Sequence, residues 1–113
     1  MKKFLGLLLA TAMLLALLCG CGNKADSKKR SIVTTIFPEY DWVTQILGDT
    51  AQDAELTMLL DNGVDLHSYQ PTAADLVKIS NCDLFLYVGG ESDAWVADAL
   101  RSAANPNRIT INL

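Results

Sequence analysis

Segments typical of β-strands alternate with segments typical of α-helices from Ser31 to Leu113. The strand-like segments are rich in β-branched and aromatic residues, and amphipathic segments separate them. The expected strands are residues 31–37, 54–60, 84–88 and 108–113, and the expected helices are residues 38–47, 72–80 and 93–103. This strand–helix alternation predicts an α/β fold, a parallel sheet with flanking helices and right-handed crossovers.

The third expected strand, Leu84–Val88, constrains the architecture further. Its sequence LFLYV is apolar at every position, which suits a strand covered on both faces, as in parallel sheets. The sequence then stops at Leu113, on the last residue of an expected strand and before any helix that would cover it. We therefore expect one (β/α) lobe over residues 31–113 that is truncated at its C-terminal end.

Capping residues mark the first two expected helices. Pro38 and Glu39 suit a helix N-terminus, and Gly48 is a typical stop. Thr72, with Asp75 three residues later, has the spacing of a capping box. The apolar side chains expected to face the core are Trp42, Val43, Ile46 and Leu47 in the first helix, Leu76, Val77 and Ile79 in the second, and Trp95, Val96 and Leu100 in the third.

The first twenty residues have the pattern of a secretory signal. The basic Met1–Lys3 precedes an apolar run, Phe4–Leu18, that would rise about 22 Å as a helix, short of a hydrocarbon core of roughly 30 Å. The run leads into Leu-Cys-Gly-Cys at positions 18–21, which resembles the bacterial lipobox, whose last cysteine is acylated and begins the mature chain. We expect a signal peptide at 1–20, a lipid-anchored flexible tether at 21–30 and the lobe at 31–113.

This interpretation leaves one unmodified cysteine in the mature chain. Cys19 departs with the signal peptide and the lipid blocks Cys21, so Cys82 has no intrachain partner for a disulfide. Because Cys82 directly precedes an apolar strand, we expect a buried structural thiol rather than a nucleophile or a ligand.

The charge of the expected lobe excludes one class of partner. From Ser31 onward the chain has three Lys and Arg against twelve Asp and Glu, a formal net charge of −9. A body this acidic repels phosphate backbones, so we expect no binding of nucleic acid.

The sequence contains no recognisable enzyme motif. Gly89-Gly90 lies between an expected strand and helix, but the dinucleotide pattern G-x-G-x-x-G, a Walker loop and a G-x-S-x-G elbow are absent. A Ser-His-Asp triad could form only around His67, the single histidine. Acidic residues such as Asp49 and Asp98 are expected on solvated faces.

His67 is the most informative residue for function. It lies in a polar loop, Asp65–Thr72, between an expected strand and a capped helix, and ligands of open α/β sheets bind outside the carboxyl ends of the strands. Neutral imidazole is a good ligand for zinc or manganese. The residues alone leave His67 open as a metal ligand or as an ordinary loop residue. Asp65 and Tyr69 could orient its ring or serve only the loop.

The segment Leu59–Asp83, LLDNGVDLHSYQPTAADLVKISNCD, resembles the first metal-ligand segment of the zinc/manganese ABC-transporter solute-binding lipoproteins. This family, cluster A-I, includes the streptococcal adhesin-type lipoproteins. The opening IVTTIFPEYDWV and the stretch LFLYVGG with SDAWV also fit, so the resemblance extends over Ile32–Leu113. The sequence departs from the family at Leu66, where members often have Pro or Glu.

The resemblance implies a site and a function. His67 takes the place of a histidine that binds zinc or manganese in the family. The family fold has two (β/α) lobes joined by a long helix, with four ligands between the lobes, so the other ligands are expected beyond Leu113. The resemblance implies a monomeric extracytoplasmic binding protein, held to membrane lipid through Cys21, that delivers metal to an ABC permease and catalyses nothing.

Other functions remain open on the sequence alone. The same lobe could belong to a lipoprotein that binds a non-metal solute, and this alternative gains if a longer chain lacks further His, Glu and Asp ligands. It could also belong to a surface adhesin whose contacts with a partner matter more than metal.

Overall fold

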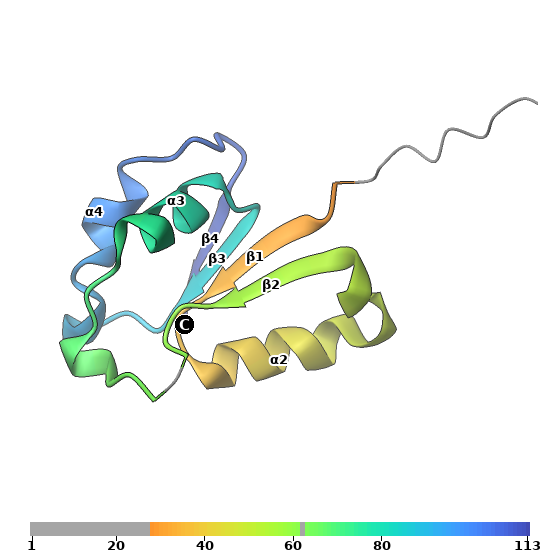
Figure 1. Cartoon of the computed structure of the whole chain (residues 1–113), viewed down its shortest axis with the longest axis horizontal. Helices are drawn as coiled ribbons and strands as arrows, with labels where there is room; N and C mark the ends of the chain where they lie inside the picture. Colours follow the sequence, from red (N-terminus) through yellow and green to blue (C-terminus); the bar gives the residue numbers. More distant parts are fainter. Residues whose placement is uncertain (1–27, 62) are drawn as a thin grey trace, which may run out of the picture.

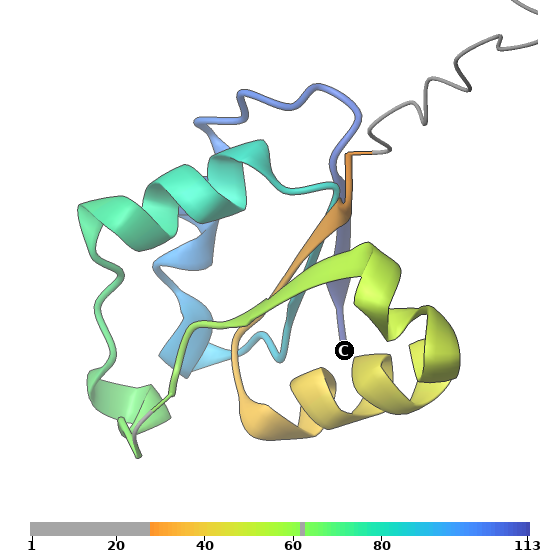
Figure 2. The same ribbon diagram turned by 45° about the vertical axis from the view of Figure 1, so that its right-hand side comes forward.

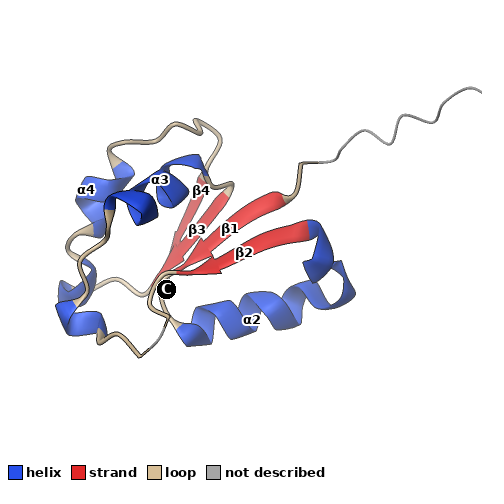
Figure 3. Cartoon of the chain, in the orientation of Figure 1, coloured by secondary structure: helices blue, strands red, loops and turns tan. Residues whose placement is uncertain are grey.

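A computed structural model describes residues 28–61 and 63–113 of the chain. Their centre is a four-stranded parallel sheet with the strand order β2-β1-β3-β4 (Figures 1 and 3). The strands are β1 (Arg30–Thr34), β2 (Ala54–Met58), β3 (Leu84–Tyr87) and β4 (Ile109–Asn112). The parallel α/β fold that the sequence predicts is therefore confirmed.

Helices cover both faces of this sheet, as Figure 2 shows. Helix α2 (Phe37–Leu47) packs on one face, and α3 (Ala73–Asn81) with the short α4 (Val96–Leu100) packs on the other. Three 3-10 turns join the elements: η1 (Gly48–Asp53), η2 (Leu66–Ser68) and η3 (Glu91–Asp93). The sequence did not predict these turns.

Successive side chains of the central strands point to opposite faces of the sheet, so the core consists of two clusters. Val33 of β1 and Phe85 of β3 face α3 and α4, where they pack with Ile79 and Val96. Ile32 of β1 and Leu86 of β3 face the opposite way and pack against Val43 of α2. These strands are apolar on both faces because helices cover both, as the uninterrupted run LFLYV predicts. In contrast, Ile109 and Ile111 of the last strand, and Leu113 directly after it, remain exposed.

The expected faces of two helices are partly wrong. In α2 the buried positions are Glu39 and Val43, whereas the side chains of Trp42 and Ile46 are 53% and 84% exposed. The helix contacts the sheet along the line of residues spaced by four, and Trp42 and Ile46 lie beside that line. In α3 Ile79 is fully buried, but Leu76 and Val77 are exposed.

The third expected helix is shorter than predicted. Instead of one helix over residues 93–103, η3 precedes α4, which ends at Leu100. At the start, the carboxylate of Asp93 accepts the backbone N–H of Gly89 and closes a tight turn. At the end, the backbone N–H groups of Ala104 and Asn105 both donate to the carbonyl of Ser80, so the chain turns towards α3.

The first two expected strands end two or three residues early, and the other two end one residue early. β1 stops at Thr34 because the next residue, Thr35, donates its backbone N–H to the side chain of Glu39. β2 stops at Met58, although Leu59 and Leu60 still donate to the carbonyls of Thr34 and Thr35. The caps are as predicted: α2 ends before Gly48, and Thr72 and Asp75 form a capping box on α3.

Cys82 is a buried free thiol, as predicted, and burial raises its pKa. The expected signal peptide, the lipobox with Cys21 and most of the tether lie outside the described residues. Within residues 28–61 and 63–113, no helix combines the length and apolarity that crossing a bilayer requires.

Candidate functional site

The chain segments that leave β2 and β3 meet at the carboxyl edge of the sheet. The segment after β2 contains η2 with His67, and the segment after β3 contains η3 with Ser92. Parallel strands bring their carboxyl ends to one edge, which is where open α/β sheets bind ligands. The position expected for His67 is therefore the one observed.

A short turn fixes the backbone around His67. Asp65 caps η2, since its Oδ1 accepts the backbone N–H of His67 at 2.7 Å and its carbonyl accepts that of Ser68 at 3.2 Å. The backbone N–H of Tyr69 donates to the carbonyl of Leu66 at 3.4 Å, and Leu66 packs against the larger core. The His67 side chain itself is exposed.

The imidazole ring of His67 meets Ser92 rather than Asp65 or Tyr69. Nδ1 of His67 and Oγ of Ser92 are 2.8 Å apart. The Asp65 carboxylate is engaged with the backbone, and the Tyr69 hydroxyl donates to Oδ2 of Asp75 at 3.1 Å. Sequence reasoning missed Ser92, although its place just after an expected strand and a Gly-Gly pair was a usable signal.

The turn that carries Ser92 requires glycine. Gly89 and Gly90 have φ angles of 87° and 77°, in the region that L side chains rarely adopt. The side chain of Asn112 in β4 lies so close to Gly89 that a Cβ there would collide with it. Asp93, which is nearly fully buried, accepts the Gly89 N–H through Oδ2 at 2.7 Å and holds the turn closed.

Two aromatic rings join the His67 and Ser92 segments. Tyr69, two residues after His67, and Trp95, three after Ser92, pack edge to face with ring centroids 5.5 Å apart. Tyr69 is buried, and this burial together with its hydrogen bond to Asp75 raises its pKa. The two turns therefore share a packed base beneath an exposed histidine.

The carboxylate of Asp75 ties this base to α3. Its Oδ2 accepts the Thr72 hydroxyl at 2.7 Å, the Thr72 N–H at 3.0 Å and the Tyr69 hydroxyl. Burial alone would raise the Asp75 pKa, but these donors and the nearby Lys78 outweigh it and lower that pKa.

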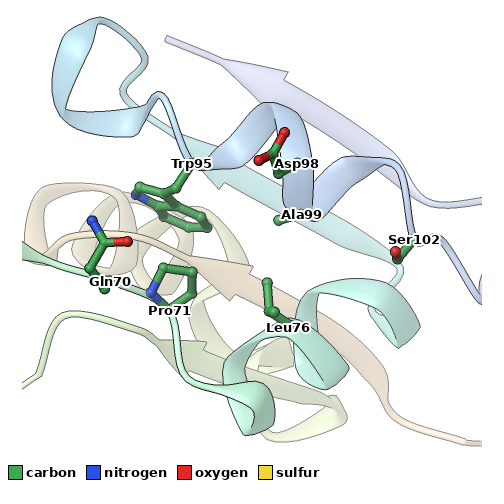
Figure 4. A pocket seen from close by; sticks show the side chains of 7 residues that line it. All are labelled: Gln70, Pro71, Leu76, Trp95, Asp98, Ala99 and Ser102. Carbon is green, nitrogen blue, oxygen red and sulfur yellow. The ribbon is translucent and has the colours of Figure 1, made fainter.

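A hollow of about 320 Å³ lies beside the site, between α3 and α4 (Figure 4). It is lined by Gln70, Pro71, Leu76, Trp95, Asp98, Ala99 and Ser102. His67 is not among these residues, so the hollow and the candidate ligand are separate features.

His67 belongs to no complete metal-binding cluster among the described residues. The sequence contains a single histidine, and residues 28–61 and 63–113 hold no group of three or more His, Cys, Asp or Glu side chains placed to bind one ion. Protein zinc sites use three or four protein ligands. His67 and the other described residues therefore do not form a complete zinc site by themselves.

The open parallel sheet, with an imidazole presented at its carboxyl edge, defines a lobe of an α/β ligand-binding protein. Residues 32–113 match the family model described as ZnuA, zinc-uptake complex component A, periplasmic. The chain therefore belongs to the ZnuA family, which confirms the resemblance to metal solute-binding proteins.

Curated relatives give the same result. The chain is 33% identical, over 98% of its length, to the high-affinity zinc uptake system protein ZnuA of Bacillus subtilis, and covers 36% of that protein. It is 36% identical, over 88% of its length, to the zinc-binding lipoprotein AdcA of Streptococcus pneumoniae, and covers 19% of it. The chain thus spans about a third or less of the length of these relatives.

Solved structures share the fold. The Zn(II)-bound ZnuA-like domain of S. pneumoniae AdcA superposes with a TM-score of 0.63 at 32% identity, over 74% of this chain and 30% of that one. The Mn-bound periplasmic metal-binding protein of Candidatus Liberibacter asiaticus superposes with a TM-score of 0.62 at 27% identity, over the same shares of the two chains.

Proposed function

We propose that this chain provides the first lobe and the first metal ligand, His67, of an extracytoplasmic metal-binding protein that serves an ABC importer. The carrying observation is the position of His67: an exposed imidazole on a fixed turn at the carboxyl edge of the sheet. The cargo is zinc or manganese, the metals in the two solved structures described above. The chain binds and delivers, and catalyses nothing.

The number of protein ligands determines how tightly the chain binds metal. One imidazole leaves the remaining positions of a tetrahedral zinc ion to water, so the described lobe alone should bind metal weakly. A complete site needs donors from outside the described residues, supplied by a second lobe that closes over His67. Delivery then requires an ABC permease as the partner, and Cys21 would hold the protein at the membrane as a monomer.

A chimera tests this proposal. Residues 32–113 replace the matching segment of B. subtilis ZnuA, and zinc and manganese affinities are measured by isothermal titration calorimetry. Loss of an outer-shell partner already costs 10–100-fold in metal affinity, so His67→Ala in the chimera should cost on the order of 100-fold or more. The same substitution in the 113-residue chain should change its weak binding little.

The parent ZnuA serves as the reference for binding, and circular dichroism melting shows that each chimera is folded. Ser68→Ala, in the same turn as His67 but carrying no ligand atom, is the matched control and should retain the affinity. A folded chimera with equal affinities for wild type and His67→Ala would contradict the proposal.

A further inference from the structure

The ring of His67 contacts a side chain that comes from another part of the chain. Ser92 Oγ lies 2.8 Å from His67 Nδ1, although 25 residues separate the two. His67 is in η2, after β2, and Ser92 is next to Asp93 in η3, after β3. Within the described part of the chain, the ring makes no second hydrogen bond.

Both ends of this contact are held independently of each other. On one side, Asp65 binds the His67 backbone N–H at 2.7 Å. On the other, the buried Asp93 accepts the Gly89 N–H at 2.7 Å, while its own N–H donates to the Gly90 carbonyl at 3.2 Å. The edge-to-face rings of Tyr69 and Trp95 then fix the distance between the two turns. The hydroxyl is thus placed against the ring by packed structure on both sides.

The direction of the hydrogen bond decides what the ring can bind. A neutral imidazole has one N–H donor and one nitrogen with a free lone pair. If Ser92 donated to Nδ1, the ring proton would be on Nε2. The lone pair of Nδ1 would then be engaged by the hydroxyl, and Nε2 would carry a proton, so neither nitrogen could bind a metal. If Nδ1–H donates to Ser92 Oγ, the lone pair of Nε2 is free on an exposed ring.

We propose that Ser92 is a positioning residue for His67: its Oγ accepts the hydrogen bond from Nδ1–H, fixes the tautomer and orients Nε2 for the metal. The role of this arrangement in metal binding rests on the proposed function, whereas the assignment of the tautomer does not depend on it. Ligating histidines usually donate their second N–H to a protein acceptor, which orients the ring and raises its basicity. A serine hydroxyl is the acceptor that this chain offers at that place.

Nitrogen NMR of the metal-free chain tests the tautomer directly. The chain has one histidine, so 15N-histidine labelling gives a single pair of ring signals in two-bond 1H–15N spectra. The measurement is made at about pH 8.5, where free imidazole is neutral. We expect the Nδ1–H tautomer in the wild-type chain, and in Ser92→Ala a shift towards the Nε2–H tautomer that free histidine prefers.

Two further variants separate positioning from general loss of structure. Ser92→Thr keeps a hydroxyl at the same place and should keep the Nδ1–H tautomer. Ser68→Ala removes a hydroxyl that donates to the Asp65 carbonyl at 3.2 Å in the same turn as His67, without touching the ring. It should leave the tautomer unchanged. An Nε2–H tautomer in the wild-type chain, or an unaltered tautomer in Ser92→Ala, would overturn the assignment of Ser92.

Metal binding is then measured in the chimera that carries residues 32–113. Ser92→Ala should lower the zinc affinity about 10-fold, and Ser92→Thr should restore it. An unchanged affinity in Ser92→Ala would overturn the positioning role. If the tautomer result holds but no chimera binds metal through His67, the proposed function fails while the hydrogen-bond assignment to Ser92 stands.

Discussion

Glu39 binds Thr35, the residue that directly follows the first strand. One carboxylate oxygen of Glu39 accepts the Thr35 N–H at 2.8 Å and the Thr35 hydroxyl at 2.9 Å, and both residues are buried. The same oxygen accepts the N–H of Ile36, the N-cap of α2, at 3.3 Å. The Thr35 carbonyl in turn accepts the N–H of Leu60, where the chain leaves β2 towards His67. A single buried carboxylate therefore organises two of the chain segments at the carboxyl edge.

Replacing Glu39 should destabilise the lobe markedly. Hydrogen bonds to charged groups contribute about 1.5–3 kcal/mol each and are not additive, so we expect Glu39→Ala to lower the free energy of unfolding by about 3 kcal/mol. Glu39→Gln keeps one acceptor oxygen and should lower the free energy of unfolding by about half as much. Urea unfolding measures both variants. Glu55→Ala, at an exposed position on β2, is the control and should change stability by less than about 0.5 kcal/mol.

Asp75 should make the lobe sensitive to acid. Its pKa is lowered in the folded state, so its carboxylate contributes stability above the unfolded-state pKa of about 3.9, and this contribution is lost as pH falls through the lower folded value. The stability difference between wild type and Asp75→Asn should therefore shrink as pH falls below about 4. Tyr69→Phe removes one hydrogen-bond donor to the carboxylate and should weaken this pH dependence. A difference that stays constant down to about pH 2 would contradict the assignment.

Gly89 should tolerate no side chain. Gly89→Ala combines a positive φ with a collision between the new Cβ and the Asn112 side chain, and the φ alone costs about 1–2 kcal/mol. Adding Asn112→Ala to Gly89→Ala should restore the part of the lost stability that comes from the collision, because it removes the side-chain atoms that the new Cβ meets. Thermal unfolding of the two single variants and the double variant measures the coupling. Strictly additive losses would show that Asn112 relaxes without cost.

The lipid anchor gives a prediction outside the described residues. If the chain is processed at the lipobox, mass spectrometry of the membrane fraction should find an acylated Cys21 at the mature N-terminus. Two or three acyl chains hold a protein firmly, whereas one holds it only marginally. Cys21→Ala should release the protein from the membrane, and Cys19→Ala should not. A thiol at Cys21 that remains free in the mature protein would contradict the anchor.

The sequence by itself determined the strand–helix order, the parallel sheet, the capping box of Thr72 and Asp75 and the place of His67. These features depend on local propensity, caps and the hydrophobic pattern, which neighbouring residues express without a tertiary partner. The buried thiol of Cys82 follows from the same pattern.

Only the tertiary structure decided which side chains meet. The outward positions of Trp42 and Ile46 depend on the line along which α2 contacts the sheet, which helical spacing leaves open. Ser92 reaches His67 because two turns 25 residues apart are brought together by parallel pairing and by the Tyr69–Trp95 contact. Such a contact follows from the register of the strands and the packing beneath the turns, so it cannot be predicted from the sequence pattern of either segment.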